Sequence, residues 1–226
     1  MKRLLAIGLL AVGACAANHN VAQSGASQTQ WRSLMDPAAW RGYKVDTIPS
    51  RWSFANGVLS KTRPVPDIVS KDEWGDFELE LEWKIGDASN SGVFYRGTDE
   101  FNQIYWSAPE YQLLDNLNAE DNKKDNHLAG SVYDLFAAPK DAARPANEWN
   151  QTRIVAKGNH VEHWLNGKKV ASYDVGSADW DAAIKASKFS PEKYPNFGKA
   201  PKGYLGIQGD HPGTLELRNI RIRELQ

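Results

Sequence analysis

Strict alternation of apolar and polar residues runs through residues 76–85. A period of two residues indicates a β-strand with one face in a core and the other in water. We therefore expect a strand of an antiparallel sheet here, with its glutamates on a solvated face. The apolar positions are Phe77, Leu79, Leu81, Trp83 and Ile85, and the polar positions between them are Glu78, Glu80, Glu82 and Lys84.

Shorter runs of the same kind are separated by turn sequences. Asn56-Gly57 and Asn166-Gly167 each follow an apolar run, and Asn-Gly is the strongest short signal for a hairpin. Helical spacing of Trp180, Ala183 and Ile184 predicts one short helix over residues 179–187. Further strands are expected at residues 90–96, 110–115, 130–136, 147–156, 160–165, 168–173, 204–208 and 214–223.

Many short strands, frequent turns and hardly any long helix favour an all-β sandwich of two antiparallel sheets. The last strand is expected to pair with an early one. Residues 31–226 are enough for one domain.

Two of the expected strands carry polar side chains on one face. In the first, that face holds Asn90, Gly92, Phe94 and Arg96. In the second, Glu110, Gln112 and Leu114 point away from Tyr111, Leu113 and Asp115. A carboxylate, two amides and a guanidinium on neighbouring strands predict the floor of a ligand groove rather than a solvated edge.

Glu110 is the carboxylate we single out. It follows Pro109 and enters an otherwise apolar strand beside Gln112. Burial would raise its pKa and suit it for general acid–base chemistry. The alternative is an ion pair with Arg96 that only holds the sheet together.

Three histidines are candidates for the groove. His211 lies in Gln208-Gly-Asp-His-Pro-Gly213, a tight turn after a strand, where functional groups are often presented, and Asp210 precedes it. His163 alternates with the apolar residues Val161 and Leu165, so it is either a hydrogen-bonded core residue or a groove residue. His127 falls in a long polar stretch, residues 115–129, which we expect to be a binding loop or lid.

The first residues indicate export. Met1-Lys-Arg3 is basic, residues 4–12 are apolar apart from Gly8, and small residues follow, as in a signal sequence (residues 1–15). The apolar run is shorter than the roughly 20 residues of a membrane-spanning helix. Cys15 is the only cysteine, and its position resembles the lipidated cysteine of a bacterial lipoprotein; plain secretion with cleavage nearby is the alternative.

Residues 16–30 are predicted to form a flexible tether. The expected location is a bacterial membrane facing the periplasm, with the protein attached through a lipid anchor at Cys15, or else the periplasm or the exterior.

The charge distribution restricts the classes of binding partner that we expect. Lys and Arg number 27 and Asp and Glu number 28, scattered along the chain, so there is no basic footprint for nucleic acid. The sequence has no zinc-protease motif, nucleophile elbow or phosphate-binding glycine loop. Asp115, Glu120, Asp121 and Asp125 are interpreted as a solvated acidic loop rather than a Ca²⁺ site.

Seven motifs occur in the order typical of one family. Together they resemble the 3-keto-disaccharide hydrolase domain family, over residues 31–225. They are Asp76-Phe-Glu-Leu, Asn90-Ser-Gly-Val-Phe-Tyr-Arg96, Glu110-Tyr-Gln-Leu-Leu-Asp115, Ala129-Gly-Ser-Val-Tyr-Asp134, Glu148-Trp-Asn150, Val161-Glu-His-Trp-Leu-Asn-Gly167 and Leu205-Gly-Ile-Gln208.

The resemblance implies a concanavalin-A-like jelly roll with a carbohydrate groove on its concave face. It also implies substrates already oxidised at C3 of the sugar, cleaved by elimination and then hydration. No cofactor is certain, and the resemblance leaves open a divalent metal as the electrophile, as in some related enzymes. Where the family often reads Gln-Asp-His-Gly, this chain has an extra Gly and a Pro in Gln208-Gly-Asp-His-Pro-Gly213.

In this hypothesis either Glu110 or His211 is the base at C2 and the other is the acid. The sugar or its enolate would be held by Arg96, Gln112 and Gln208, with Asn90, Tyr133, His163 and Asp210 as further contacts. Two competing hypotheses are a non-catalytic, lectin-like carbohydrate-binding protein and a surface adhesin that binds protein.

Overall fold

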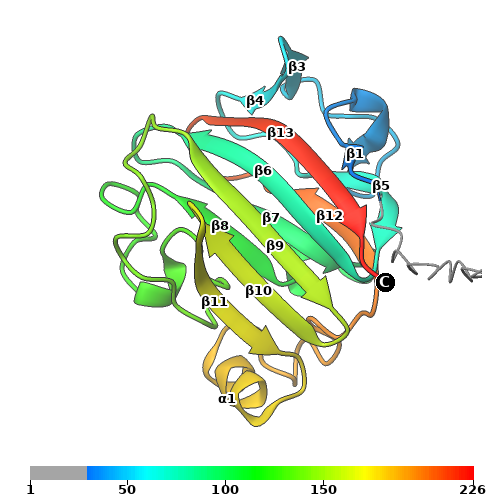
Figure 1. Ribbon diagram of the computed structural model, residues 1–226, viewed down its shortest axis with the longest axis vertical. Coiled ribbons are helices and arrows are strands. Elements are labelled where there is room, and N and C mark those ends of the chain that lie inside the picture. The colour runs from blue at the N-terminus through cyan, green and yellow to red at the C-terminus, as the bar shows by residue number, and fades with distance from the viewer. Residues whose placement is uncertain (1–29) are drawn as a thin grey trace, which may run out of the picture.

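Two antiparallel β-sheets packed face to face form the domain (Figure 1). The computed structural model describes residues 30–226, so the predicted export signal, Cys15 and all of the predicted tether except Gln30 lie outside the described residues. No helix within residues 30–226 has the length and apolar character to cross a membrane.

The first sheet has eight strands. Their order is β11 (Lys168–Asp174), β10 (His160–Leu165), β9 (Asn150–Lys157), β6 (Phe77–Ile85), β13 (Leu215–Glu224), β4 (Val58–Lys61) and β3 (Ser53–Ala55), and β1 (Arg32–Ser33) also pairs with β13. The last strand therefore pairs with early ones, as predicted.

The second sheet has five strands, in the order β2 (Trp40–Gly42), β5 (Ile68–Trp74), β12 (Gly203–Ile207), β7 (Asn90–Gly97) and β8 (Glu110–Leu114). Short helices lie in the connections: η1 (Pro37–Ala39), η2 (Ile104–Trp106), η3 (Asp125–His127) and α1 (Ala178–Ala186). The predicted all-β sandwich and the short helix predicted at residues 179–187 are both confirmed.

Both Asn-Gly hairpins are confirmed. Asn56 and Gly57 have φ of 53° and 72°, and Asn166 and Gly167 have φ of 51° and 80°. Positive φ at both central residues is what a type I′ turn needs, and Asn-Gly supplies it at low cost.

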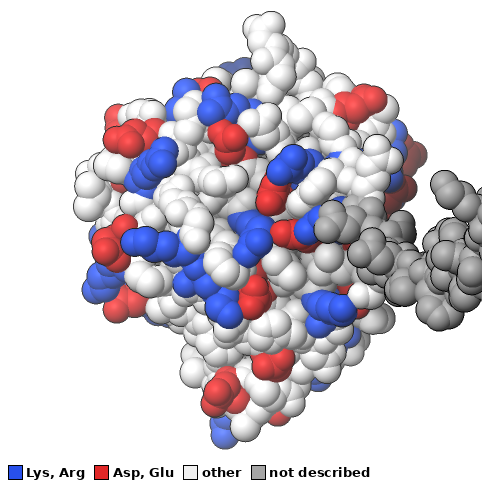
Figure 2. Space-filling model, viewed as in Figure 1, with Lys and Arg blue, Asp and Glu red and all other residues white. Residues whose placement is uncertain are grey.

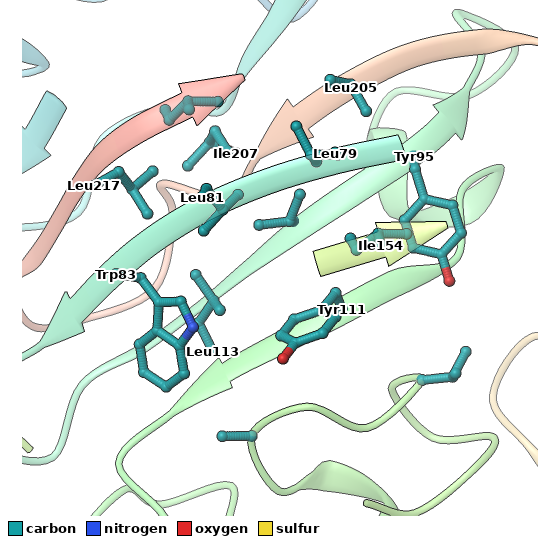
Figure 3. Packing of buried hydrophobic residues seen from close by; sticks show 14 of the residues in the cluster. Leu79, Leu81, Trp83, Tyr95, Tyr111, Leu113, Ile154, Leu205, Ile207 and Leu217 are labelled. Carbon is teal, nitrogen blue, oxygen red and sulfur yellow. The ribbon is translucent and has the colours of Figure 1, made fainter. Parts of the chain in front are cut away.

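The alternation in β6 separates core from solvent as predicted. Leu79, Leu81 and Trp83 point between the sheets, where they meet Leu113 of β8 and Ile207 of β12 (Figure 3). On the other face Glu78, Glu80 and Glu82 each bind an arginine of β13. Mixed positive and negative charge therefore covers the outer face of the eight-stranded sheet (Figure 2).

The strand predicted at residues 130–136 is wrong. This stretch forms consecutive turns with isolated bridges at Val132 to Tyr111 and Phe136. Gly130 and Asp134 have φ of 88° and 58°, and the left-handed backbone at both positions prevents an extended chain. The turn folds back over the edge strand β8 and carries Tyr133 with it.

Candidate active site

A polar pocket opens on the outer face of the five-stranded sheet, with a cavity volume of about 170 Å³. Strands β7 and β8 and the end of β12 form its floor. In Figure 1 this sheet lies behind the eight-stranded one, so the pocket faces away from the viewer. Seven predicted residues meet there: Asn90, Glu110, Gln112, Tyr133, Gln208, Asp210 and His211.

Glu110 lies on the pocket floor, 5 % exposed. Its neighbours in β8, Tyr111 and Leu113, point the opposite way into the core (Figure 3), as the predicted alternation requires. The carboxyl group lies over Gly92 of β7, where an added Cβ would come within 2.0 Å of Glu110 Oε1. Gly92 thus leaves the space that the Glu110 side chain occupies.

Burial raises the pKa of Glu110 to about 8, with Lys188 opposing the shift and Asp67 and Asp210 adding to it. No donor among residues 30–226 hydrogen-bonds to its carboxyl group. The expected elevation of this pKa is confirmed. A buried carboxyl of this kind holds its proton near neutral pH and has room for a ligand.

Three amide side chains surround the bare backbone of Gly92. Gln112 lies directly across from Gly92 on β8, and the Gln208 N–H donates to the Gly92 carbonyl at 2.9 Å. Both polar atoms of the Gln112 amide, Asn90 Oδ1 and Gln208 Oε1 are buried without a partner within the described residues. An unpaired buried polar atom costs about 1–3 kcal/mol, so these amides are arranged for a polar ligand.

His211 is presented by a turn, residues 208–213, that two buried side chains hold. Lys61 Nζ donates to the carbonyl oxygens of His211 (2.8 Å) and Gly213 (3.3 Å). Asp67 accepts the backbone N–H of Gly209 at 2.7 Å. Burial lowers the pKa of His211 below its ordinary value, so its imidazole is mainly neutral at pH 7.

One wall of the pocket is aromatic and was not predicted. Tyr105 and Trp106 come from η2, and Lys188 follows α1 with its Nζ 4.4 Å from the Tyr133 ring centroid and 5.5 Å from that of Tyr105. These residues lie in irregular segments, where no periodicity indicates which way a side chain points. The run Ile104-Tyr-Trp106 between two groove strands was the available signal.

Arg96 does not reach the pocket, and both its predicted substrate contact and the alternative ion pair with Glu110 are wrong. Its φ of 52° breaks the alternation of β7, so the side chain turns toward the other sheet. There it donates to the carbonyls of Gly75 and Gly158 and pairs with Asp76 at 3.1 Å.

His163 is a core residue, and its placement among the groove residues is wrong. It is fully buried between the sheets, with its ring nitrogens 2.8 Å from Tyr95 Oη and 3.0 Å from the Gly130 carbonyl oxygen. Burial lowers its pKa to about 4, so the ring is neutral. The alternative prediction of a hydrogen-bonded core histidine is confirmed.

The pocket therefore joins a carboxyl group, an imidazole, free amides and an ammonium group. Within residues 30–226 no three His, Cys, Asp or Glu side chains are grouped closely enough to hold a metal ion. The arrangement is suited to moving protons on a polar ligand about the size of a sugar ring.

Fold and pocket together define a jelly-roll β-sandwich with a polar pocket on its five-stranded sheet. Residues 30–223 match the family described as 3-keto-alpha-glucoside-1,2-lyase-like domains. The chain belongs to this family, as the sequence motifs indicated.

Similar proteins support this family assignment. The chain is 34 % identical over 216 residues to a 3-keto-disaccharide hydrolase of Bacteroides thetaiotaomicron, covering 82 % of this chain and 74 % of the relative. A crystal structure named for a glycosyl hydrolase of Parabacteroides distasonis superposes with a TM-score of 0.79 at 28 % identity, over 87 % of this chain and 94 % of that one.

A carbohydrate-binding module of Bacillus subtilis superposes with a TM-score of 0.51 at 12 % identity, over 88 % of this chain and 98 % of that one. This last likeness is one of fold alone.

Proposed function

We propose that this protein cleaves glycosides whose sugar ring carries a ketone at C3, by elimination across C1 and C2 followed by hydration. One observation carries the proposal: the buried, unpaired carboxyl of Glu110, with its raised pKa, lines the same pocket as the neutral imidazole of His211. The family description and the name of the Bacteroides relative support the substrate class.

The C3 ketone makes the hydrogen at C2 acidic. A base removes that proton, and the electron pair moves onto the C3 oxygen as an enolate. The pair then forms the C1–C2 double bond while the C1–O bond to the leaving group breaks, and an acid protonates the departing oxygen. Water finally adds, with OH at C1 and H at C2, so that the net reaction is hydrolysis without an oxocarbenium ion.

The protonation states favour one of the two role assignments. At neutral pH most of Glu110 is protonated, since its pKa is about 8, whereas His211 is mainly neutral with a free lone pair. We therefore assign His211 as the base at C2 and Glu110 as the acid toward the leaving oxygen.

Lys188 and the amides complete the proposed site. The Lys188 ammonium lines the pocket and makes no ion pair or hydrogen bond within residues 30–226, and it takes the role of a cation near the enolate oxygen that was expected of Arg96. Asn90, Gln112 and Gln208 would bind the ring hydroxyls and the ketone, which satisfies their unpaired atoms.

A lectin would use the same amides but has no need for Glu110. An unpaired carboxyl in a buried site costs folding free energy, and sugar binding by hydrogen bonds is achieved without it. The free Glu110 therefore favours catalysis over simple binding.

The dependence of the rate on the leaving group tests the assignment of Glu110 as the acid. Glu110→Gln should lower kcat/KM about 10²–10⁴-fold on a 3-keto-glucoside with an alkyl leaving group. On a nitrophenyl 3-keto-glucoside the loss should be much smaller, because nitrophenolate needs no proton to leave. His211→Ala should lose activity on both substrates, and deuterium at C2 should slow the parent on the alkyl glycoside.

Equal losses for Glu110→Gln on both substrates would reverse the roles of the two residues. Sugar binding without any turnover in the parent, and no exchange of the C2 hydrogen with solvent, would support the lectin instead. Thermal unfolding of each variant checks that the fold is retained.

Export and lipid attachment at Cys15 are a separate proposal, which rests on the sequence of residues 1–15. In a bacterial host the full chain should incorporate a palmitate analogue and fractionate with membranes, whereas Cys15→Ala should be unlabelled. Labelling of neither chain, with both in the soluble periplasmic fraction, would indicate plain secretion.

A further inference from the structure

His127 lies behind the pocket wall, between two carboxylates. Its Nδ1 is 2.7 Å from Asp121 Oδ1 and its Nε2 is 3.0 Å from Asp134 Oδ1. The residue is buried, and its ring packs against that of Tyr133, with centroids 4.4 Å apart and the planes tilted by 31°. The proposed reaction uses neither His127 nor the two aspartates.

The geometry fixes how many protons this imidazole carries. Ionised carboxylates only accept hydrogen bonds, so each ring nitrogen must donate for both contacts to form. A neutral ring has one donor, and its other nitrogen would turn a lone pair toward an anionic oxygen. The observed arrangement therefore requires an imidazolium.

Both aspartates also bind the pocket wall. Asp121 Oδ2 accepts from the Tyr133 hydroxyl at 2.8 Å, and Asp134 Oδ2 accepts the backbone N–H of Lys188 at 2.9 Å. His127 thus links Asp121, which binds the Tyr133 hydroxyl, to Asp134, which binds the backbone of Lys188.

We propose that His127 is a positioning residue, a doubly protonated bridge between Asp121 and Asp134 that holds Tyr133 and Lys188 in place. Its effect on catalysis rests on the proposed function, through these two pocket residues. The protonation state of His127 is independent of the proposed function.

Further charged groups surround the bridge. Although burial opposes it, hydrogen bonds from the Lys188 N–H, His127 and Lys124 hold the pKa of Asp134 below its ordinary value. Lys188 itself lies over Tyr133, and Asp125, beside His127 in η3, pairs with Lys140.

Nitrogen NMR of ¹⁵N-histidine-labelled protein tests the bridge directly. At about pH 7.5, where exposed imidazoles are mostly neutral, both nitrogens of His127 should resonate as protonated. His127→Gln assigns the signals. A single protonated nitrogen in the parent at this pH would overturn the proposal.

Asp121→Asn provides a variant with no need for the second proton. The amide oxygen still accepts from Tyr133, and the amide nitrogen donates to the unprotonated Nδ1 of a neutral His127. This variant should show a singly protonated His127 with the wall intact. Two protonated nitrogens in this variant would contradict the argument.

His127→Gln tests the positioning role. Glutamine offers one donor to two carboxylates, so one side of the bridge is lost, and kcat/KM should fall about tenfold. His160→Gln is the matched control, because His160 also lies near two carboxylates, Asp174 and Glu162, but is exposed on the other sheet. Equal effects of the two variants would show that His127 has no special role.

A second readout needs no turnover. After ¹³C-methylation of lysines, the Lys188 signal, assigned with Lys188→Arg, should show the ring-current shift of the Tyr133 and Tyr105 rings. That shift should shrink in His127→Gln and persist in His160→Gln. An unchanged Lys188 signal in folded His127→Gln would overturn the positioning role even if the parent has no activity on 3-keto sugars. If His127→Gln does not fold, the protonation state in the parent and in Asp121→Asn decides.

Discussion

Gly92 determines where the proposed catalytic carboxyl lies. An alanine Cβ at this position would lie 2.0 Å from Glu110 Oε1 and 2.6 Å from its Cδ, so Glu110 must move. We expect Gly92→Ala to lower kcat/KM by about 100-fold or more, because a misplacement of about 1 Å can cost this much, while unfolding free energy falls by about 1–3 kcal/mol. Steady-state kinetics and denaturant unfolding give the two numbers.

Gly75→Ala is the matched control. Its Cβ would meet only ordinary contacts, 3.4 Å from the Pro201 carbonyl oxygen and 3.6 Å from Lys202 Cβ, and its φ is not positive. Activity close to that of the parent is expected for this variant. If Gly92→Ala is as active as Gly75→Ala, the position of Glu110 is not critical.

The raised pKa of Glu110 also predicts how stability depends on pH. Between the ordinary pKa of 4.5 and the folded value of about 8, the folded state binds a proton that the unfolded state releases. The contribution of this group to stability therefore falls as pH rises through that window.

Glu110→Gln removes that dependence. The variant should be more stable than the parent by a few kcal/mol at about pH 8.5, and the difference should shrink toward about pH 4.5. Urea unfolding at several pH values measures it. A variant less stable than the parent at high pH would mean that the ionised carboxylate has a favourable partner in the folded state.

The turn at residues 208–213 presents Gln208, Asp210 and His211 together. Its backbone carbonyls depend on Lys61, which is 2 % exposed and whose pKa burial lowers to about 8. Lys61→Met keeps the apolar stem but removes both hydrogen bonds. We expect kcat/KM to fall about tenfold and amide exchange of residues 209–214 to accelerate, since two buried carbonyls lose their donor.

Lys84→Met is the control for Lys61→Met. Lys84 pairs with Glu216 at 3.0 Å on the solvated face of the eight-stranded sheet. Its loss should leave both kinetics and exchange unchanged. Normal exchange of the turn in Lys61→Met would indicate that the other hydrogen bonds, such as that of Asp67 to Gly209, are sufficient.

Elements with a regular period could be predicted from sequence, and irregular ones could not. The β6 alternation and both Asn-Gly turns depend on local chemistry, and the structure contains the strand and both hairpins as predicted. Glu110 and Gln112 were placed correctly because β8 is regular. Arg96 was misplaced because one residue with positive φ reverses the face, and Lys188 was missed because tertiary contacts alone bring it to the pocket.

At the scale of the whole molecule, the two outer faces of the sandwich differ in kind. The five-stranded sheet carries buried polar groups without partners, which cost stability and serve a ligand. The eight-stranded sheet carries cross-strand pairs of glutamate and arginine that satisfy each other (Figure 2). We infer that substitutions on the second face act on stability alone.

Glu78 and Glu80 provide the test, because they occupy equivalent positions on β6 with different exposure. The Glu78 side chain is 8 % exposed and binds both Arg223 and Arg153, whereas Glu80 is 20 % exposed and binds Arg221, which is half exposed. Glu78→Gln should lower the unfolding free energy by about 1–3 kcal/mol, because charged hydrogen bonds are lost in a buried setting.

Glu80→Gln should change the unfolding free energy by less than about 1 kcal/mol, as exposed ion pairs contribute little. Calorimetry should show a lower Tm for Glu78→Gln, by about 2–4 °C per kcal/mol in a domain of this size. Both variants should keep the kcat/KM of the parent on 3-keto-glucosides, because their side chains face away from the pocket. A loss of activity in folded Glu78→Gln would mean that the two sheets are coupled through the core, and would contradict this division between the faces.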